Sequence, residues 1–360
     1  MAGVDAASFR AQFPVCEEKA FLNAGTCGPL PRAAVAAHQT VAERALTEGR
    51  AMAYYEAFFA ARDRLRAGYA DVLGAETADV SVTTATSEGI VRVLLGLDLQ
   101  AGDEVLIAAD EHPGLLGPLA ALRDRLGLTV REVPLEHIAE AATDKTRLVA
   151  CSHVGWTTGE PAPSLTGLPD NLPVLLDGAQ GVGAVPVDLD ALGCSFYAGS
   201  GQKWLCGPVG TGMLWVSPAW RDRLSSVGPT YVNLEVPADG LDARPHADGR
   251  GHDAIAMSLE TASAALASLD VLATFGWEHV HTHARSLAAE LAEGLRSAGR
   301  DVAPRGDTTL VSWRSDDAEA EAARLAAANV VVRSFHGLPY VRASVGAWND
   351  HSDIERLLAA

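Results

Sequence analysis

Short apolar runs alternate with amphipathic stretches through much of the chain. Apolar runs of about four to eight residues bounded by turn residues are typical of buried strands, and a 3.6-residue apolar period is typical of helices. Several runs are apolar on both faces, which indicates a parallel or mixed sheet with helices on both sides. The predicted strands cover residues 78–84, 104–109, 128–135, 146–154 and 173–180, and the helices between them cover 87–99 and 114–127.

The segments on either side of this region have a different character. Residues 33–73 have a helical pattern rich in Ala, Arg and Glu, and a second long helical stretch runs from about residue 258 to residue 300. Residues 228–254 are irregular and rich in Gly, Pro and Asp, and a loop of this length is usually functional or lies at an interface. From residue 307 onward, strand-like runs and helices resemble a small α+β domain.

Composition and charge remove several classes of protein. The chain has 360 residues, 48% of them hydrophobic, so it can bury a large core. Its formal net charge of −18 repels phosphate backbones and anionic membranes, so we expect neither nucleic acid nor a membrane as a partner. No uncharged apolar run approaches the roughly 20 residues that span a bilayer, and the start of the chain has no signal-peptide pattern. We therefore expect a cytoplasmic protein.

Polar residues stand at the ends of three predicted strands. In open α/β sheets, ligands bind at the carboxyl ends of the strands. These ends carry His112, Ser152 with His153, and Asp177. The pattern predicts a ligand site beside them.

Lys203 lies in a Gly-rich turn between two strand-like runs, in the segment YAGSGQKWLCGPVGTGMLWV. Trp204, Leu205 and the turn after them would bury its surroundings, and a desolvated lysine has a lowered pKa and attacks carbonyls. Asp177 ends the buried run PVLL, where a carboxylate can pair with a pyridinium nitrogen, and Gln180 follows it. The alternatives are an ordinary solubilising charge for Lys203 and a helix-capping role for Asp177.

A dinucleotide-binding loop is another alternative for the glycines. Neither GVG at 181–183 nor GPVGTG at 207–212 fits G-x-G-x-x-G at the start of a helix, and the second runs directly into the strand-like MLWV. The glycine pattern therefore argues against an NAD-dependent dehydrogenase.

Together these segments resemble the class V, fold-type I enzymes that use pyridoxal 5'-phosphate (PLP). That group includes cysteine desulfurases, cystine C–S lyases, isopenicillin N epimerase-like proteins and class V aminotransferases. The resemblance runs from about Phe21 to the end, with the motifs in the family's order. It implies an α/β fold, with a mixed and mostly parallel sheet covered by helices on both faces, and a small α+β domain. The implied parts are an N-terminal segment, 1–32, that packs with the small domain, a large PLP-binding domain, 33–240, and a small C-terminal domain with a long connecting helix, 241–360.

The resemblance also implies cofactor contacts, residue by residue. Lys203 would bond covalently to PLP, Asp177 would pair with the ring nitrogen, Gln180 would contact the ring 3-hydroxyl, and His112, in EHP, would stack on the ring. The segment TATSEG opens a predicted helix, and a helix N-terminus favours an anion. The implied phosphate-binding residues are Thr86, Ser87, Ser200 and Gln202, and at the last of these positions the family often has His.

Four segments would contact the substrate if the resemblance holds. Arg342, in PYVRASVG, matches the arginine that binds the substrate α-carboxylate, for which bidentate guanidinium geometry is suited. Arg333 lies where cystine-lyase relatives carry a second arginine, which would suit a substrate with two carboxylates; the alternative is a surface strand residue. Trp156 or Thr157 would lie near the substrate, or else belong to an ordinary turn after a strand. Asn23 matches a segment that closes over the substrate.

The chain also departs from the family pattern. Desulfurases need a catalytic cysteine in the C-terminal part, but the last of the five cysteines here is Cys206, so a persulfide-forming desulfurase is not expected unless Cys27 substitutes. Where relatives place a threonine from the neighbouring subunit on the phosphate, this chain has Ala256, with Ser258 nearby. The wide spacing of the cysteines argues against a metal site. The histidines of EHVHTH (279–283) are more simply interpreted as solvated residues of a helix than as metal ligands.

We therefore expect a PLP-dependent enzyme that acts on an amino acid, with Lys203 removing the α-proton. The favoured reaction is β-elimination from cystine or a cysteine-derived thioether, and a class V aminotransferase or an amino-acid epimerase is the alternative. A PLP-fold protein without activity is disfavoured, because both Lys203 and Asp177 are present. The resemblance also implies a homodimer with the active site at the subunit interface.

Overall fold

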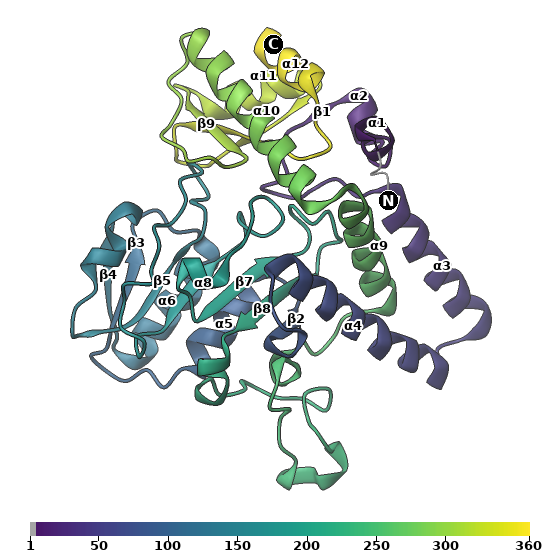
Figure 1. Cartoon of the computed structure of the whole chain (residues 1–360), viewed down its shortest axis with the longest axis vertical. Helices are drawn as coiled ribbons and strands as arrows, with labels where there is room; N and C mark the ends of the chain where they lie inside the picture. The colour runs from purple at the N-terminus through teal and green to yellow at the C-terminus, as the bar shows by residue number, and fades with distance from the viewer. Residues whose placement is uncertain (1–4) are drawn as a thin grey trace.

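The computed structural model describes residues 5–360. Within this part of the chain, a seven-stranded sheet has the strand order β2-β8-β7-β6-β5-β3-β4, and only β8 runs against the other strands. The expected mixed and mostly parallel sheet is therefore confirmed (Figure 1). Its strands are β2 (Val80–Thr83), β3 (Glu104–Ala108), β4 (Thr129–Val133), β5 (Thr146–Ser152), β6 (Val174–Asp177), β7 (Phe196–Ser200) and β8 (Gly212–Val216).

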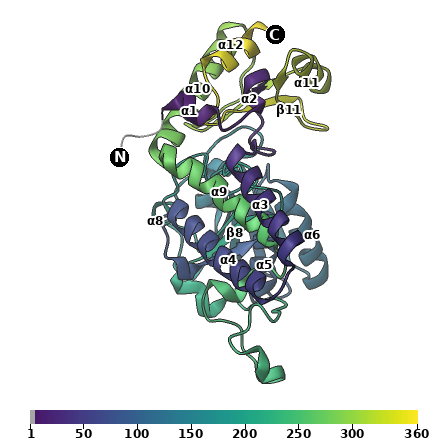
Figure 2. The ribbon, with the colours of Figure 1, turned by 90° about the vertical axis from the view of Figure 1, so that its right-hand side faces the viewer.

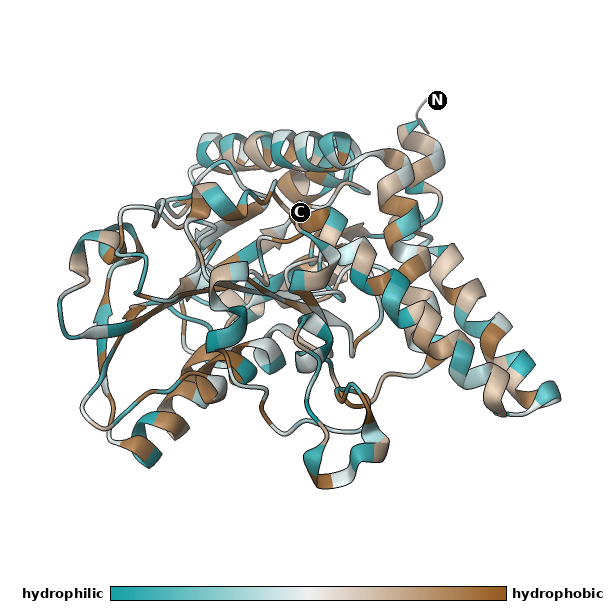
Figure 3. Ribbon diagram, turned by 60° about the horizontal axis from the view of Figure 1, so that its bottom comes forward, coloured by the Kyte–Doolittle hydropathy of each residue, from teal (hydrophilic) through white to brown (hydrophobic). Residues whose placement is uncertain are grey.

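Side chains alternate between two hydrophobic layers along the central strands of the sheet. Leu175 packs in one layer with Ile90 of α5 and Leu119 of α6, whereas its neighbour Leu176 packs in the other with Leu65 of α4. Figure 3 shows these strands coloured mostly as hydrophobic. Burial on both faces explains why the runs are apolar throughout rather than alternating. The helices and short 3₁₀ turns of this region are α3 (Arg32–Glu48), α4 (Met52–Leu73), η1 (Thr77–Asp79), α5 (Thr86–Gly96), α6 (Pro113–Leu126), η2 (Leu135–His137), α7 (Ile138–Ala141), α8 (Leu189–Leu192) and η3 (Pro218–Arg223).

Both long helical stretches predicted from the sequence are interrupted. The first divides into α3 and α4 at residues 49–51, where Gly49 has a φ of 79°. The second divides into α9 (Leu259–Phe275) and α10 (Trp277–Ser297) at Gly276, whose φ of 96° favours glycine. As a result, α9 lies along α3 and α4 beside the large sheet, and α10 continues into the small domain (Figures 1 and 2).

The small domain is an antiparallel sheet, β11-β12-β9, packed against helices. The N-terminal segment joins it, because β1 pairs in parallel with β10 and Leu22 lies in the same core as Trp313 and Val341. The exact limits of the three predicted parts, 1–32, 33–240 and 241–360, stay a prediction. The elements here are α1 (Ala6–Arg10), α2 (Val15–Glu18), β1 (Ala20–Phe21), β9 (Leu310–Arg314), α11 (Ala318–Ala327), β10 (Val330–Val331), β11 (Arg333–Ser334), β12 (Tyr340–Ser344) and α12 (His351–Ala359).

The irregular stretch 228–254 projects from the large domain as an extended arm with η4 (Pro237–Asp242) at its tip (Figure 1). It returns to the body through η5 (Gly249–His252), where Asp253 is fully buried. Among residues 5–360, no helix has both the length and the apolar character needed to cross a membrane.

Asp253 anchors the returning arm through a buried ion pair. Its two carboxylate oxygens each accept a hydrogen bond from Arg66 at 2.7 Å, and one also accepts from the Val82 amide at 2.9 Å. A second guanidinium, that of Arg62, lies 3.5 Å away. Removing one member of such a pair leaves a buried charge without its partner.

We predict that Asp253→Ala lowers the free energy of unfolding by about 3–5 kcal/mol, because it leaves Arg62 and Arg66 uncompensated in the interior. Urea denaturation of the wild type and the variant measures the difference. Glu48→Ala, which removes an exposed partner of Arg44, is the matched control and should change stability by at most about 0.5 kcal/mol. Equal losses in the two variants would contradict the role of the buried pair.

Candidate active site

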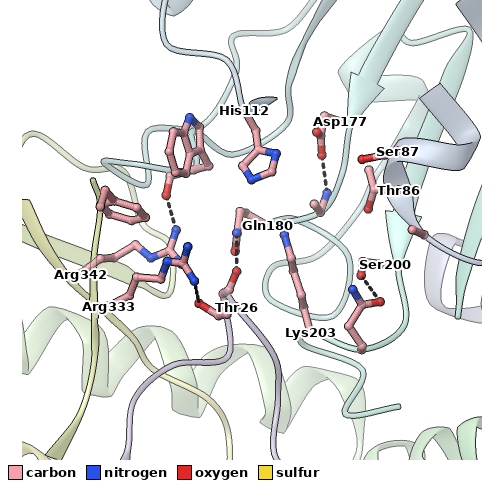
Figure 4. A pocket seen from close by; sticks show the side chains of 16 residues that line it. Thr26, Thr86, Ser87, His112, Asp177, Gln180, Ser200, Lys203, Arg333 and Arg342 are labelled. Atoms are coloured by element: carbon pink, nitrogen blue, oxygen red, sulfur yellow. Dashed lines mark hydrogen bonds between the residues drawn. The ribbon is translucent and has the colours of Figure 1, made fainter. Parts of the chain in front are cut away.

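A pocket lies at the carboxyl edge of the large sheet, where the small domain and the N-terminal segment meet it (Figure 4). It contains about 670 Å³ of empty space, part of which is open to solvent. Its walls hold all the sequence-predicted site residues except Asn23 and Thr157. They are Gly25, Thr26, Ala85, Thr86, Ser87, His112, Trp156, Asp177, Ala179, Gln180, Ser200, Gln202, Lys203, Arg333, Phe335 and Arg342.

Lys203 stands in the middle of this pocket, on the turn between β7 and β8. Desolvation by the surrounding protein lowers the pKa of its amine to about 8, although Asp177 acts in the opposite direction. The chain has three lysines, and the other two, Lys19 and Lys145, are exposed. Lys203 is therefore the lysine that presents a partly neutral, nucleophilic amine near neutral pH.

Asp177 ends β6 at the edge of the pocket. Parallel pairing places Ser152 of β5 and Ala198 of β7 beside it. Its Oδ1 accepts a hydrogen bond from the Ala179 amide at 2.9 Å, which fixes the carboxylate at the start of the turn that carries Gln180. Both side chains are buried, so the anion faces the pocket rather than bulk water.

One end of the pocket is rich in uncharged hydrogen-bond donors. Thr86 and Ser87 form the first turn of α5, and the buried Thr86 hydroxyl has no hydrogen-bond partner among residues 5–360. Opposite them, the Ser200 hydroxyl donates to Gln202 Oε1 at 2.8 Å, which leaves the Gln202 amide nitrogen available as a donor. An unpaired buried hydroxyl at a helix N-terminus is suited to a phosphate group.

His112 caps the pocket above Lys203 (Figure 4). Its Nδ1 accepts a hydrogen bond from the Gly114 amide at 2.9 Å, and its ring meets Trp156 edge to face at 5.0 Å. Burial lowers the pKa of His112, and the nearby Lys203 charge acts in the same direction. A neutral imidazole held by its edge is suited to stack on a flat ring.

Glu111 lies behind His112 and is almost fully buried. The Ser152 amide and hydroxyl both donate to its carboxylate at 2.7 Å, so Glu111 ties the loop after β3 to the end of β5. Burial raises the pKa of Glu111 to about 7, and the neighbouring Asp177 charge adds to the shift. The sequence analysis missed this residue, although its position directly before His112 is a signal that could have drawn attention to it.

The opposite end of the pocket is cationic and aromatic. Arg333 and Arg342 face each other across the antiparallel pair β11–β12. The guanidinium of Arg342 lies 5.0 Å from the centre of the Phe335 ring, and that ring meets Trp156 at 4.9 Å. Burial, together with the charge of Arg333, lowers the pKa of Arg342 to about 9, so this end favours an anionic ligand.

Two predicted substrate residues lie outside the pocket wall. Asn23 forms a parallel bridge with Ser344, and its side chain accepts from the Thr26 hydroxyl. Thr157 is buried, and its carbonyl accepts from Ser312. In their place, Gly25, Thr26 and Phe335 line the pocket, contacts made between segments far apart in the chain that local sequence patterns do not reveal.

Other residues singled out from the sequence lie elsewhere. Cys206 is buried, and burial raises the pKa of its thiol well above the ordinary value. Ser258 caps α9 by accepting from the Thr261 amide at 3.0 Å, and Ala256 is exposed. The expectation of solvated histidines is wrong for His281, which packs in the interior as α10 turns its apolar face inward. Within residues 5–360, no cluster of His, Cys, Asp and Glu side chains is arranged to hold a metal ion.

The fold thus brings together a lysine with a lowered pKa, a buried carboxylate, a histidine ring above the lysine and the first turn of a helix with an unpaired buried hydroxyl. The family model for aminotransferase class V matches residues 21–357, and the chain belongs to this family. The chain is therefore a PLP-dependent enzyme, and the expected cofactor and fold are confirmed.

Several known proteins are similar to the chain over most of its length. A probable cysteine desulfurase from Pseudomonas aeruginosa is 32% identical over 84% of this chain and 82% of its own. An isopenicillin N epimerase from Amycolatopsis lactamdurans is 30% identical over 79% of this chain and 76% of its own. A solved structure of the cystine C–S lyase C-DES with cysteine persulfide has a TM-score of 0.89 and 27% identity, over 97% of this chain and 98% of that one. Another C-DES structure, with glycine linked covalently to PLP, has a TM-score of 0.90.

We predict that PLP attaches to the cofactor-free protein at a rate that rises with pH through a midpoint near 8, because only the neutral amine of Lys203 attacks the aldehyde. Stopped-flow absorbance measures the rate. Lys203→Ala should show no attachment. A midpoint near 10.5, the ordinary value for lysine, would contradict the desolvated amine.

A second pH effect is expected from Glu111. Because its folded-state pKa lies above the ordinary 4.5, the carboxyl stabilises the fold fully only below that value, and this contribution is lost as pH rises through about 7. When the pH is raised from 5 to 8, the free energy of unfolding of Glu111→Gln should increase by about 2–3 kcal/mol relative to that of wild type. Urea denaturation of the cofactor-free proteins at both pH values measures this, and a pH-independent difference would contradict it.

Proposed function

We propose that the enzyme is a C–S β-lyase that acts on cystine or on a cysteine-derived thioether. The observation that carries the proposal is the division of the pocket into two ends, with hydroxyl and amide donors at one and the Arg333–Arg342 pair at the other. Cystine has two carboxylates, which match two guanidinium groups. The likeness to the cystine C–S lyase C-DES supports the same reaction.

We assign the cofactor contacts to the residues that line the first end and the middle of the pocket. Thr86, Ser87, Ser200 and Gln202 would bind the phosphate, Asp177 would pair with the ring nitrogen, and His112 would stack on the ring. Bound PLP supplies an aldehyde that takes up the substrate amine and a ring that withdraws electrons from the α-carbon. The residues fit this group because the pocket offers a free buried hydroxyl at a helix start and a buried carboxyl group, that of Asp177.

The protein's own groups then act on the substrate. Arg342 binds the α-carboxylate and so orients the Cα–H bond toward Lys203. Lys203, once released from the cofactor, takes the α-proton as a neutral amine, since its pKa is about 8. The Cβ–S bond breaks, its electron pair leaves with sulfur as cysteine persulfide, and water converts the three-carbon remainder to pyruvate and ammonia.

A lyase fits the cysteines better than a desulfurase that forms an enzyme persulfide. Such an enzyme needs a reactive thiol that reaches the substrate sulfur, and reactive thiols have a lowered pKa. Cys206 and Cys151 are buried and their pKa values are raised well above the ordinary value. The five cysteines are free thiols, which also supports a reducing compartment such as the cytoplasm.

We further propose a homodimer. On α4, Met52, Tyr55 and Phe59 recur at helical spacing and are 70%, 50% and 39% exposed. Tyr231 on the projecting arm and Ile255, directly after the arm, are exposed as well. Apolar side chains gathered on one face favour burial against a second copy. Sedimentation of Phe59→Glu against wild type tests this, and a wild-type monomer with full activity would contradict it.

The reaction is tested by mixing PLP-loaded enzyme with one equivalent of L-cystine and no keto acid. We expect pyruvate in amounts that match the cystine consumed, with the cofactor absorbance restored at the end. Conversion of the cofactor to its amine form without pyruvate would instead indicate transamination, and a change of configuration at Cα without elimination would indicate an epimerase. Either of these results would overturn the lyase proposal.

Substitutions of the two arginines should have different kinetic effects when two substrates are compared. Arg333→Met should raise KM for L-cystine about 10-fold, since an exposed arginine that binds the distal carboxylate is lost, and should leave β-chloro-L-alanine, which has one carboxylate, unaffected. Arg342→Lys should lower kcat/KM for both substrates by about 10²–10³-fold, because the bidentate contact is lost. Equal effects of Arg333→Met on both substrates would contradict the assignment of the distal carboxylate.

A further inference from the structure

Trp204, the residue directly after Lys203, links three segments of the active site. Its side chain is 2% exposed, and its indole nitrogen donates to Gln180 Oε1 at 3.1 Å. Gln180 Nε2 in turn donates to the Gly25 carbonyl at 2.9 Å (Figure 4). The lysine turn, the turn after β6 and the N-terminal segment are thus joined by two consecutive hydrogen bonds.

These two contacts fix which way the Gln180 amide points. A side-chain amide has a donor end and an acceptor end, and the two orientations have the same shape. An indole N–H can only donate, so it selects the oxygen, and a backbone carbonyl can only accept, so it selects the nitrogen. Because the –NH₂ group carries two hydrogens and Gly25 uses one, the other remains available to the pocket that Gln180 lines.

Close packing keeps Gln180 in this place. Its side chain is 4% exposed. The approach of the N-terminal segment is so close that a Cβ at Gly25 would lie 2.9 Å from Gln180 Oε1. The lysine turn is close-packed as well, because a Cβ at Gly183 would lie 2.6 Å from Leu205 and 3.2 Å from Trp204. The amide is therefore confined to this place, and its orientation depends on the indole N–H together with the Gly25 carbonyl.

We propose that Trp204 is a positioning residue, which locks the Gln180 amide so that its –NH₂ group points at the ring oxygen of PLP. This inference rests on the proposed role of Gln180 at the cofactor ring. Trp204 acts through Gln180 and touches neither substrate nor cofactor in this account. A simple packing role would need the bulk of the indole but not its N–H group.

The hydrogen bond has a spectroscopic consequence. PLP linked to Lys203 would supply a chromophore whose visible absorbance changes when the linkage loses its proton. A donor aimed at the oxygen stabilises the deprotonated form. Replacing the indole N–H should therefore move this transition to higher pH, by about 0.5–1 unit for one lost hydrogen bond.

The test is a spectrophotometric pH titration of four PLP-loaded proteins: wild type, Trp204→Phe, Gln180→Leu and the double variant. Trp204→Phe keeps an aromatic ring but lacks the donor, and Gln180→Leu removes the amide. We expect both single variants to shift the transition upward, Gln180→Leu at least as far. The double variant should match Gln180→Leu, because Trp204 has no other route to the cofactor. An unshifted Trp204→Phe variant, or shifts that add in the double variant, would overturn the proposal.

Trp220→Phe is the matched control. Trp220 is 6% exposed in the core of the large domain, against Phe196 and Arg223 and outside the pocket wall. Trp220→Phe should leave the pH of the absorbance transition unchanged. A shift equal to that of Trp204→Phe would assign the effect to packing and overturn the proposal. Trp204→Leu, which also lacks the N–H, should repeat the upward shift. If neither Trp204 variant holds PLP at saturating concentration, the residue is needed for packing and the proposal is wrong.

Failure of the proposed function has a different signature. In that case wild type would form no pyruvate from L-cystine, whatever its absorbance transition does, and a wrong assignment of Gln180 would show as an unshifted Gln180→Leu variant. A normal wild-type transition with an unchanged Trp204→Phe variant would leave the proposed function intact and remove only the role of Trp204.

Discussion

A lysine amine held away from bulk water beside one buried carboxylate is the constraint on which the rest of the active site depends. Lys203 would be an ordinary cation if it were exposed, as Lys19 and Lys145 are. Desolvation lowers its pKa to about 8, and the Asp177 charge keeps the pKa from falling further. An amine with this pKa can serve both as a nucleophile for cofactor attachment and as a base for proton removal, which are the two roles that we propose for Lys203.

The charge distribution of the pocket opposes that of the whole chain. The chain has a formal net charge of −18, yet Lys203, Arg333 and Arg342 line this pocket with Asp177 as the lone carboxylate of its wall. Glu111, a buried carboxyl group directly before His112, has a pKa raised to about 7 and so loses much of its charge near neutral pH. An acidic protein thus concentrates positive potential where a phosphate and an amino-acid carboxylate must bind.

The sequence predicted best those residues whose position follows from a strand end. Asp177, Ser152 and His112 follow short apolar runs, and parallel pairing brings such ends to one edge of a sheet. Lys203 was found because its turn separates two strand-like runs. By contrast, Phe335 and Gly25 reach the pocket only through contacts between the small domain, the N-terminal segment and the large domain, and local patterns carry no signal for such contacts. The breaks at Gly49 and Gly276 were missed because a single glycine in a helical pattern is compatible with a continuous helix.

The most direct test of this account is to find where PLP attaches. The holoenzyme is reduced with borohydride, digested, and its peptides are identified by mass spectrometry. With three lysines in the chain, the result is decisive: the account predicts the adduct on Lys203 alone, and none in Lys203→Ala. An adduct on Lys19 or Lys145, or no adduct on any lysine, would contradict the central claim that the desolvated amine at the sheet edge holds the cofactor.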